Sequence, residues 1–178
     1  MRVLILILFS IAGFFSGLYL PSSHANANIN MPQLPTTLNL VGQANFSVLW
    51  WDIYQIQLFT ENGSYRTNQY PLILKLTYQR KISKDNLLEE TANQWKRFKI
   101  SSAQQSQWLA QLAAIWPDVN KQDRIEFYVD THNNSHFYFN GNYVGSIFDE
   151  TFSHVFSQIW LAENAEYPQL AKALKGMN

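Results

Sequence analysis

An aromatic stretch at residues 137–147 reads FYFNGNYVGSI and indicates how the end of the chain folds. Aromatic residues precede Asn140-Gly141, and a second short apolar stretch follows this pair. Asn and Gly both tolerate the positive φ that a tight hairpin turn requires. We therefore predict a β-hairpin whose two strands join at Asn140-Gly141.

Two helices are expected after this hairpin. Asp149 is placed to cap the first helix, whose apolar residues recur on one face. The second is bracketed by Pro168 at its first position and Gly176 after its last turn. The apolar face of the first helix comprises Phe152, Val155, Phe156, Ile159 and Trp160.

Residues 40–58 alternate with a period of two, which predicts a strand. Even-numbered positions are apolar from Leu40 to Leu58, except at Asp52. Because this stretch is longer than a usual strand, we expect a bend or bulge near residues 50–52. A second alternating stretch, residues 72–80, predicts another strand.

The middle of the chain combines two helices with one strand. Ser83 can cap a helix that runs toward Phe98, and a second helix is expected from about Ser102 to Trp116, where a proline prevents its continuation. Residues 125–129 alternate again and predict a strand. Strands and helices are thus segregated along the chain, which predicts an α+β fold rather than alternating β-α-β units.

The N-terminus predicts export. Arg2 is followed by an apolar run to Leu20 and then by the small-x-small site at Ala25 and Ala27. This order is typical of a secretory signal peptide, although an uncleaved membrane anchor is the competing interpretation. We predict a signal peptide at residues 1–27, a leader at 28–37 and a single domain at 38–178, located in the periplasm or secreted.

Composition excludes several classes of function. The chain has no cysteine, so disulfides, thiolate metal sites and cysteine nucleophiles are excluded, and its 13 basic and 13 acidic residues cancel to a formal net charge of zero. Without clustered basic residues, neither nucleic acid nor an anionic membrane surface is an expected partner, and no stable membrane insertion is expected after removal of the signal peptide. His132 and His136 flank a turn without a compact third ligand, so we interpret them as part of a surface hairpin. We expect neither a metal nor a cofactor.

Tyr78 and Arg80 suggest a site for an anion. Both lie on the same face of the strand predicted at 72–80, beyond an apolar row, and together they could hold a carboxylate or phenolate. The alternative is that the strand ends at Tyr78 and Arg80 extends into water. Six tryptophans in a small domain also suit an aromatic cleft, although each one taken singly suits core packing.

The chain resembles the short exported bacterial branch of the chalcone isomerase-like family. The resemblance rests on VGQANFSVLWWDIY (41–54), on the segment from FNG (139–141) to IWL (159–161), and on PQLAKALKG (168–176). It implies an open-faced β-sandwich, in which a layer of helices covers a large antiparallel sheet and a cleft lies between the two layers.

The resemblance also carries expectations about chemistry. Chalcone isomerases use an arginine on the first long strand to stabilise a phenolate, and a tyrosine and an asparagine around the first long helix. The corresponding positions here hold Asn45, Leu87 and Gln94. The resemblance thus implies that the isomerase site is altered, and that a fatty acid is a plausible ligand because non-catalytic members bind one.

Three functions remain open at this stage. The first is an exported, non-catalytic binding protein for a fatty acid or a similar small apolar anion. The second is an isomerase or lyase acting on a flavonoid-like substrate, and the third is a structural or partner-binding domain. For the first we predict these ligand-binding residues: Tyr78, Arg80, Trp50, Tyr54, Trp95, Phe152 and Phe156.

Overall fold

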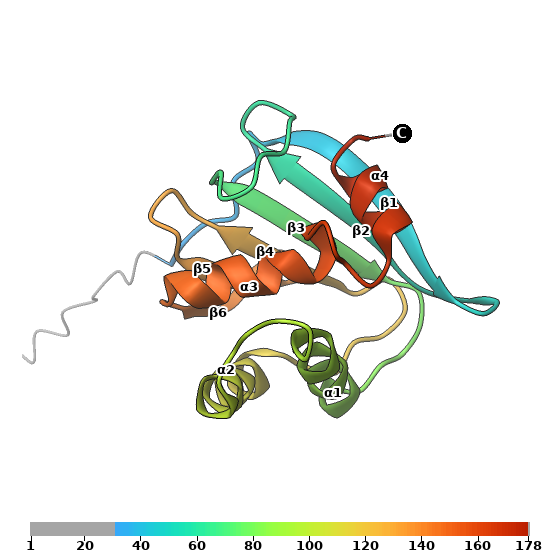
Figure 1. Cartoon of the computed structure of the whole chain (residues 1–178), viewed down its shortest axis with the longest axis vertical. Coiled ribbons are helices and arrows are strands. Elements are labelled where there is room, and N and C mark those ends of the chain that lie inside the picture. Colours follow the sequence, from blue (N-terminus) through green and yellow to red (C-terminus); the bar gives the residue numbers. More distant parts are fainter. Residues whose placement is uncertain (1–30, 178) are drawn as a thin grey trace, which may run out of the picture. The chain divides into compact units, whose positions relative to one another are not determined.

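The computed structural model describes residues 31–177, so the predicted signal peptide and the first part of the leader lie outside the described residues. The elements follow the predicted α+β order (Figure 1). The strands are β1 (Asn39–Val48), β2 (Trp51–Thr60), β3 (Leu72–Tyr78), β4 (Arg124–Val129), β5 (Ser135–Phe139) and β6 (Asn142–Ile147). The helices are α1 (Lys84–Trp95), α2 (Ser102–Ile115), α3 (Glu150–Leu161) and α4 (Pro168–Leu174).

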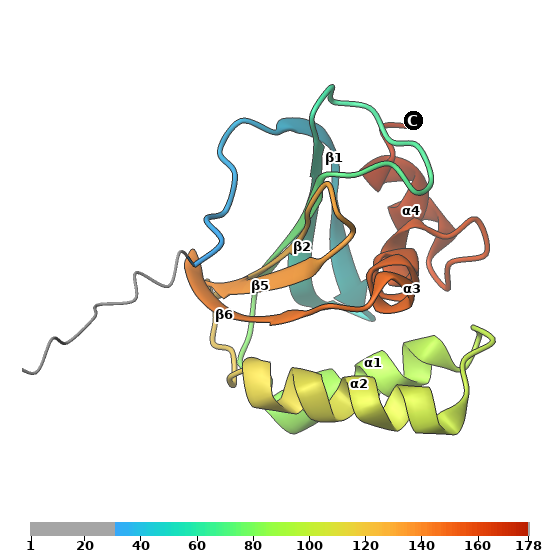
Figure 2. The same cartoon turned by 90° about the vertical axis from the view of Figure 1, so that its left-hand side faces the viewer.

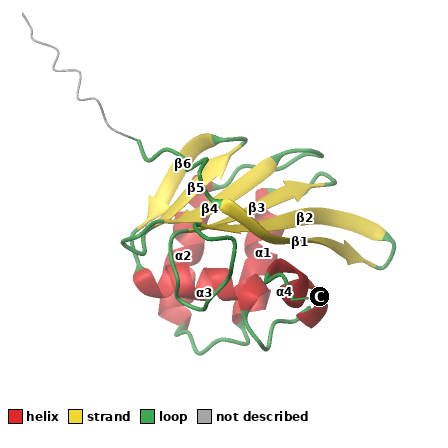
Figure 3. Ribbon diagram, turned by 90° about the horizontal axis from the view of Figure 1, so that it is seen from above, coloured by secondary structure: helices red, strands yellow, loops and turns green. Residues whose placement is uncertain are grey.

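The strands form one antiparallel sheet in the order β1-β2-β3-β4-β5-β6. All four helices lie on the same side of this sheet (Figures 2 and 3), so the prediction of an open-faced sandwich is confirmed. The core between the two layers is strongly aromatic, because Trp95, Trp108, Phe127, Phe137 and Phe152 are all buried in it. Among the described residues, no helix is both long and apolar enough to cross a bilayer.

The start of the sheet differs from the prediction. Residues 40–58 form two strands joined at Leu49 and Trp50, and not one long strand. The register shifts between Phe46 and Ser47, where Ile53 is an extra residue on β2. Because of this bulge, even-numbered residues of β1 lie opposite even-numbered residues of β2, as Phe46 lies opposite Tyr54. The inward-facing residues of both strands are therefore even-numbered. The alternation therefore continues through a turn.

Local signals for turns and helix caps are confirmed. Asn140 and Gly141 adopt positive φ values of 52° and 83° in the hairpin between β5 and β6. The Ser83 side chain accepts a hydrogen bond from the backbone N–H of Asn86, and Asp149 accepts one from Phe152. These side chains satisfy N–H groups that have no partner within their helices.

The outer face of the sheet corrects one expectation. His132 is exposed as predicted, but His136 is buried and lies 3.1 Å from Asp130 and 2.7 Å from Ser146. Nearby, the Tyr138 hydroxyl donates a hydrogen bond of 2.8 Å to the backbone oxygen of Pro32 in the leader. His136 thus belongs to a buried polar network, and within residues 31–177 no group of three or more potential metal ligands occurs.

Candidate functional site

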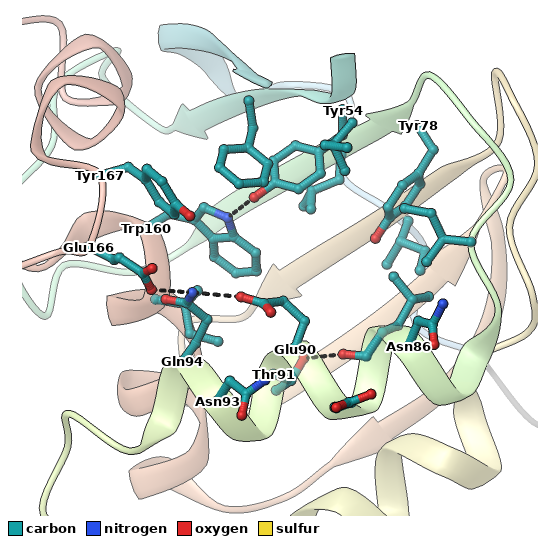
Figure 4. A pocket seen from close by; sticks show the side chains of 18 of the residues that line it. Tyr54, Tyr78, Asn86, Glu90, Thr91, Asn93, Gln94, Trp160, Glu166 and Tyr167 are labelled. Atoms are coloured by element: carbon teal, nitrogen blue, oxygen red, sulfur yellow. Dashed lines mark hydrogen bonds between the residues drawn. The ribbon is translucent and has the colours of Figure 1, made fainter. Parts of the chain in front are cut away.

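A pocket of about 580 Å³ lies between the inner face of the sheet and the helices. Its volume is within the range of small-molecule sites, roughly 300–1,000 Å³. Residues of β1, β2, β3 and β4 line one side, and residues of α1, α3 and the loop before α4 line the other (Figure 4). Most of the wall is apolar: Phe46, Val48, Ile53, Leu76, Ile82, Leu87, Ile125, Phe127, Phe156, Ile159 and Leu170.

Tyr54 provides one polar group within this apolar wall. Its hydroxyl oxygen accepts a hydrogen bond of 2.9 Å from the indole N–H of Trp160 (Figure 4). The Tyr54 proton has no acceptor among the described residues, so it remains free to be donated to a ligand. Burial raises the pKa of Tyr54, which keeps this hydroxyl protonated.

Tyr78 provides a second hydroxyl from the neighbouring strand. Its side chain is only 4% exposed, and its ring lies 5.9 Å from that of Tyr54. In Figure 4 the hydroxyl points away from β3 into the pocket, and residues 31–177 offer it no hydrogen-bond partner. Burial raises the pKa of Tyr78, so the pocket contains two neutral phenol donors on neighbouring strands.

The rim of the pocket along α1 is acidic. Gln94 is buried there and donates hydrogen bonds to Glu90, at 2.7 Å, and to Glu166, at 2.6 Å. Its oxygen accepts a hydrogen bond from Arg97, whose guanidinium also donates to the backbone oxygen of Ile159 at 2.7 Å. Gln94 therefore fixes two carboxylates at the rim, while Arg97 is bound behind it.

The charges around the pocket disfavour an anionic head group. Glu89, Glu90 and Glu166 all line the pocket, and no arginine, lysine or histidine of residues 31–177 does so. Arg97, which lies outside the pocket wall, is 3.6 Å from Glu166 and offsets its charge, but Glu89 and Glu90 would still repel a carboxylate placed beside them. Neutral groups that accept a hydrogen bond suit the two tyrosines, whereas donor or cationic groups suit the rim.

Several predicted residues do meet in this pocket. Tyr54, Tyr78 and Phe156, predicted as ligand contacts, all line it. Leu87 and Gln94, which the resemblance matched to polar positions of chalcone isomerases, line it as well. The structure therefore brings these five side chains together in the cleft between sheet and helices.

Arg80 lies elsewhere. β3 ends at Tyr78, so the expectation that alternation continues to Arg80 is wrong. Arg80 is exposed, and its guanidinium lies over the Trp51 ring, 4.9 Å from the ring centroid. It is not among the residues that line the pocket, so the alternative of a solvated Arg80 describes the geometry.

The remaining candidates also lie outside the pocket wall. Trp95 and Phe152 are buried in the aromatic core, with their ring centroids 6.2 Å apart. Trp50 is 86% exposed at the turn between β1 and β2, and Asn45 pairs with Gln55 on the outward-facing positions of those strands. Residues of β1 that do face the helices, such as Ala44 and Phe46, are apolar.

Sequence reasoning missed three polar features of the site. Trp160 was expected only as part of an apolar helix face, and two adjacent acidic residues on a predicted helix, such as Glu89 and Glu90, indicate no more than a charged helix surface. Glu166 lies in the loop before α4, 72 positions from Gln94, to which it is hydrogen bonded. No local pattern in the sequence reports a contact over that separation.

The fold and the pocket define the class of protein. A family model described as chalcone isomerase-like matches residues 24–176. The chain therefore belongs to the chalcone isomerase-like family, as its motifs predicted.

Individual relatives add detail. An uncharacterized protein of Haemophilus influenzae is 28% identical over 136 residues, which cover 76% of this chain and 67% of that protein. A crystal structure of a fatty-acid binding protein of Arabidopsis thaliana matches with a TM-score of 0.64 and 12% identity, and covers 81% of this chain and 89% of that chain. At this identity, the likeness shows a shared fold.

Proposed function

We propose that this protein binds a small apolar molecule, of fatty-acid type or similar, in the pocket between sheet and helices. The observation that carries the proposal is the pair of neutral tyrosine hydroxyls, both free to donate, on the sheet side of a mostly apolar pocket. Burial of the apolar body would supply most of the affinity, at about 25 cal/mol per Å². The fatty-acid binding protein of Arabidopsis thaliana, which shares the fold, makes a binding role consistent with the family.

The head group of the ligand is bound in its uncharged form. Tyr54 and Tyr78 are each able to donate a hydrogen bond to an oxygen of the ligand, in a carbonyl, an alcohol or a protonated carboxylic acid. The rim carboxylates of Glu89 and Glu90 disfavour an ionised acid, whose burial without a partner is costly. This modifies the expectation of an anion held by Arg80.

Titration with a long-chain fatty acid and with the alcohol of the same chain length tests the proposal. Quenching or enhancement of tryptophan fluorescence reports binding, because Trp116 and Trp160 line the pocket. If the acid binds only when protonated, its affinity falls by about tenfold for each pH unit above its own pKa, while the affinity of the alcohol stays constant. Equal affinity for the acid at pH 6 and pH 8 would contradict uncharged binding.

Removal of a hydroxyl locates the head group. Tyr78→Phe and Tyr54→Phe should each weaken binding of the alcohol by about two- to tenfold, the effect of one neutral hydrogen bond. Tyr143→Phe is the matched control, since Tyr143 lies on β6 and does not line the pocket. Loss of affinity in the control alone, or no saturable binding by wild type, would contradict the site. Turnover of a chalcone by the protein would instead favour the isomerase alternative.

A further inference from the structure

The turn between β1 and β2 carries a cluster of exposed apolar side chains. We call residues 48–51 the hairpin tip; its members are Val48, Leu49, Trp50 and Trp51. Leu49 is 79% exposed, Trp50 is 86% exposed and Trp51 is 56% exposed. Figure 1 shows this hairpin extending beyond the rest of the sheet. Large apolar side chains grouped in this way mark an interaction surface more often than a random surface feature.

A tight turn and a hydrogen bond at its base define the conformation of the hairpin tip. Leu49 adopts a positive φ of 57°, the backbone conformation that two-residue hairpin turns favour. Below it, the Ser47 hydroxyl donates a hydrogen bond of 2.6 Å to Asp52, which closes the base of the turn. Leu49 and Trp50 are thereby held at the end of a paired ladder, between Val48 and Trp51, which pair with each other.

Positive charge lies beside the apolar tip. The Arg80 guanidinium stacks on the Trp51 ring, and Lys81 next to it is exposed. Asp52 at the base of the turn is exposed and accepts a hydrogen bond from Ser47 while keeping its charge, so Arg80 and Lys81 together outweigh it. Tryptophan is enriched at membrane–water interfaces, where its ring lies among head groups, and arginine and lysine add attraction to anionic lipids.

We propose that the hairpin tip docks into the surface of a lipid bilayer, with Leu49 and Trp50 among the acyl chains and Arg80 at the level of the phosphates. Val48 connects the tip to the pocket, because it is both 45% exposed and part of the pocket wall. Docking therefore brings the pocket beside the apolar phase of the bilayer. The docking surface is separate from the tyrosine site, so it can be tested without any pocket ligand.

Lipids brominated in their acyl chains test the contact directly. The full chain is mixed with vesicles of phosphatidylcholine and phosphatidylglycerol, and the emission of Trp50 is taken as the difference between each protein and its Trp50→Phe counterpart. We expect brominated vesicles to quench this emission. For Leu49→Asp, the lipid concentration that gives half-maximal quenching should rise by about tenfold or more, because one buried leucine is lost and a charge is added.

Two further variants make the test specific. Arg80→Gln should weaken binding about fivefold on vesicles with phosphatidylglycerol and leave neutral vesicles unaffected. Phe148→Asp is the matched control, because Phe148 is 75% exposed but follows β6 at the opposite edge of the sheet. Residues 1–30 are the same in all variants, so a difference between variants arises from the substituted side chain.

The proposal is overturned if Trp50 emission is unchanged by brominated lipid, or if Phe148→Asp reduces quenching as much as Leu49→Asp. A concentration-dependent dimer that Leu49→Asp abolishes, without quenching by lipid, would also overturn it and would identify a second copy of the chain as the partner.

Discussion

Tyr54 and Tyr78 have an unusual position for two phenols. They lie on paired strands, directly opposite each other, and both face the helices. Desolvation by burial is the main cause that raises the pKa of each; Tyr54 further raises the pKa of Tyr78, whereas at Tyr54 the hydrogen bond from Trp160 acts in the opposite direction and Tyr167 and Glu90 raise the pKa. Both therefore stay neutral at any physiological pH, and a change in pH acts on the ligand and not on these donors.

The raised pKa values predict a loss of stability in alkali. Above a pH of about 10, an unfolded chain ionises its tyrosines, whereas Tyr78 in the folded protein keeps its proton. The unfolded state then binds fewer protons, so the free energy of unfolding decreases as pH rises, by about 1.4 kcal/mol per pH unit for Tyr78 alone. Urea denaturation between pH 9 and pH 11 should show a shallower decrease for Tyr78→Phe. A slope as steep as that of wild type would contradict this account.

Gly42 controls the contact between β1 and α4. A Cβ at this position would lie 2.7 Å from the backbone oxygen of Leu174 and still closer to that of Ala173. Because both neighbours are backbone atoms, they cannot rotate away as a flexible side chain can. The close approach of a strand glycine to the last turn of the final helix explains how α4 can lie against β1 in Figure 1.

Gly42→Ala should accordingly destabilise the domain by about 1–3 kcal/mol, the usual effect of overpacking. Gln43→Ala is the matched control on the same strand, since Gln43 is exposed and changes there lie within about 0.5 kcal/mol. Chemical denaturation monitored by circular dichroism measures both. Equal stability of the two variants would show that α4 moves aside without strain.

At the scale of elements, most of the fold could be predicted from sequence because its signals are local. Asn140-Gly141, Ser83 and Asp149 each act on residues within the next few positions, and all three formed the expected turn or cap. Leu49 and Trp50 formed a turn that their residue types do not suggest. Because the bulge at Ile53 keeps the inward-facing apolar residues at even-numbered positions on both sides of the turn, the alternation gave no sign of that turn.

The site was predicted less completely, because its chemistry depends on distant contacts. Alternation along β3 correctly placed Tyr78 on the inner face. The strand ends at Tyr78, however, so alternation does not extend to Arg80, which lies over the Trp51 ring instead. The hydrogen bond between Tyr54 and Trp160 joins residues 106 positions apart. Tertiary packing sets such pairs, and a periodic pattern gives only the face on which each residue lies.

Considered as a whole, the molecule combines an apolar pocket, a projecting tip and a leader held to the outer face of the sheet through Tyr138 and Pro32.

The N-terminal sequence preceding this leader predicts export. We expect cleavage after Ala27, so that the mature chain begins at Asn28, because the small-x-small site follows the apolar run. Intact mass of the protein recovered from the periplasm or medium decides this. A mass that retains residues 1–27 would support the membrane anchor instead.

The bulge at Ile53 also has a consequence for how related chains can diverge. It separates the tip from the body of the hairpin, where Phe46 and Tyr54 remain paired on the pocket side. A residue inserted or deleted between these two can be absorbed at the bulge or the turn without reversing the faces of β1 and β2. In evolution, length variation should therefore gather in residues 47–53. Homologues can then differ in the length of the hairpin tip while the residues that line the pocket keep their positions.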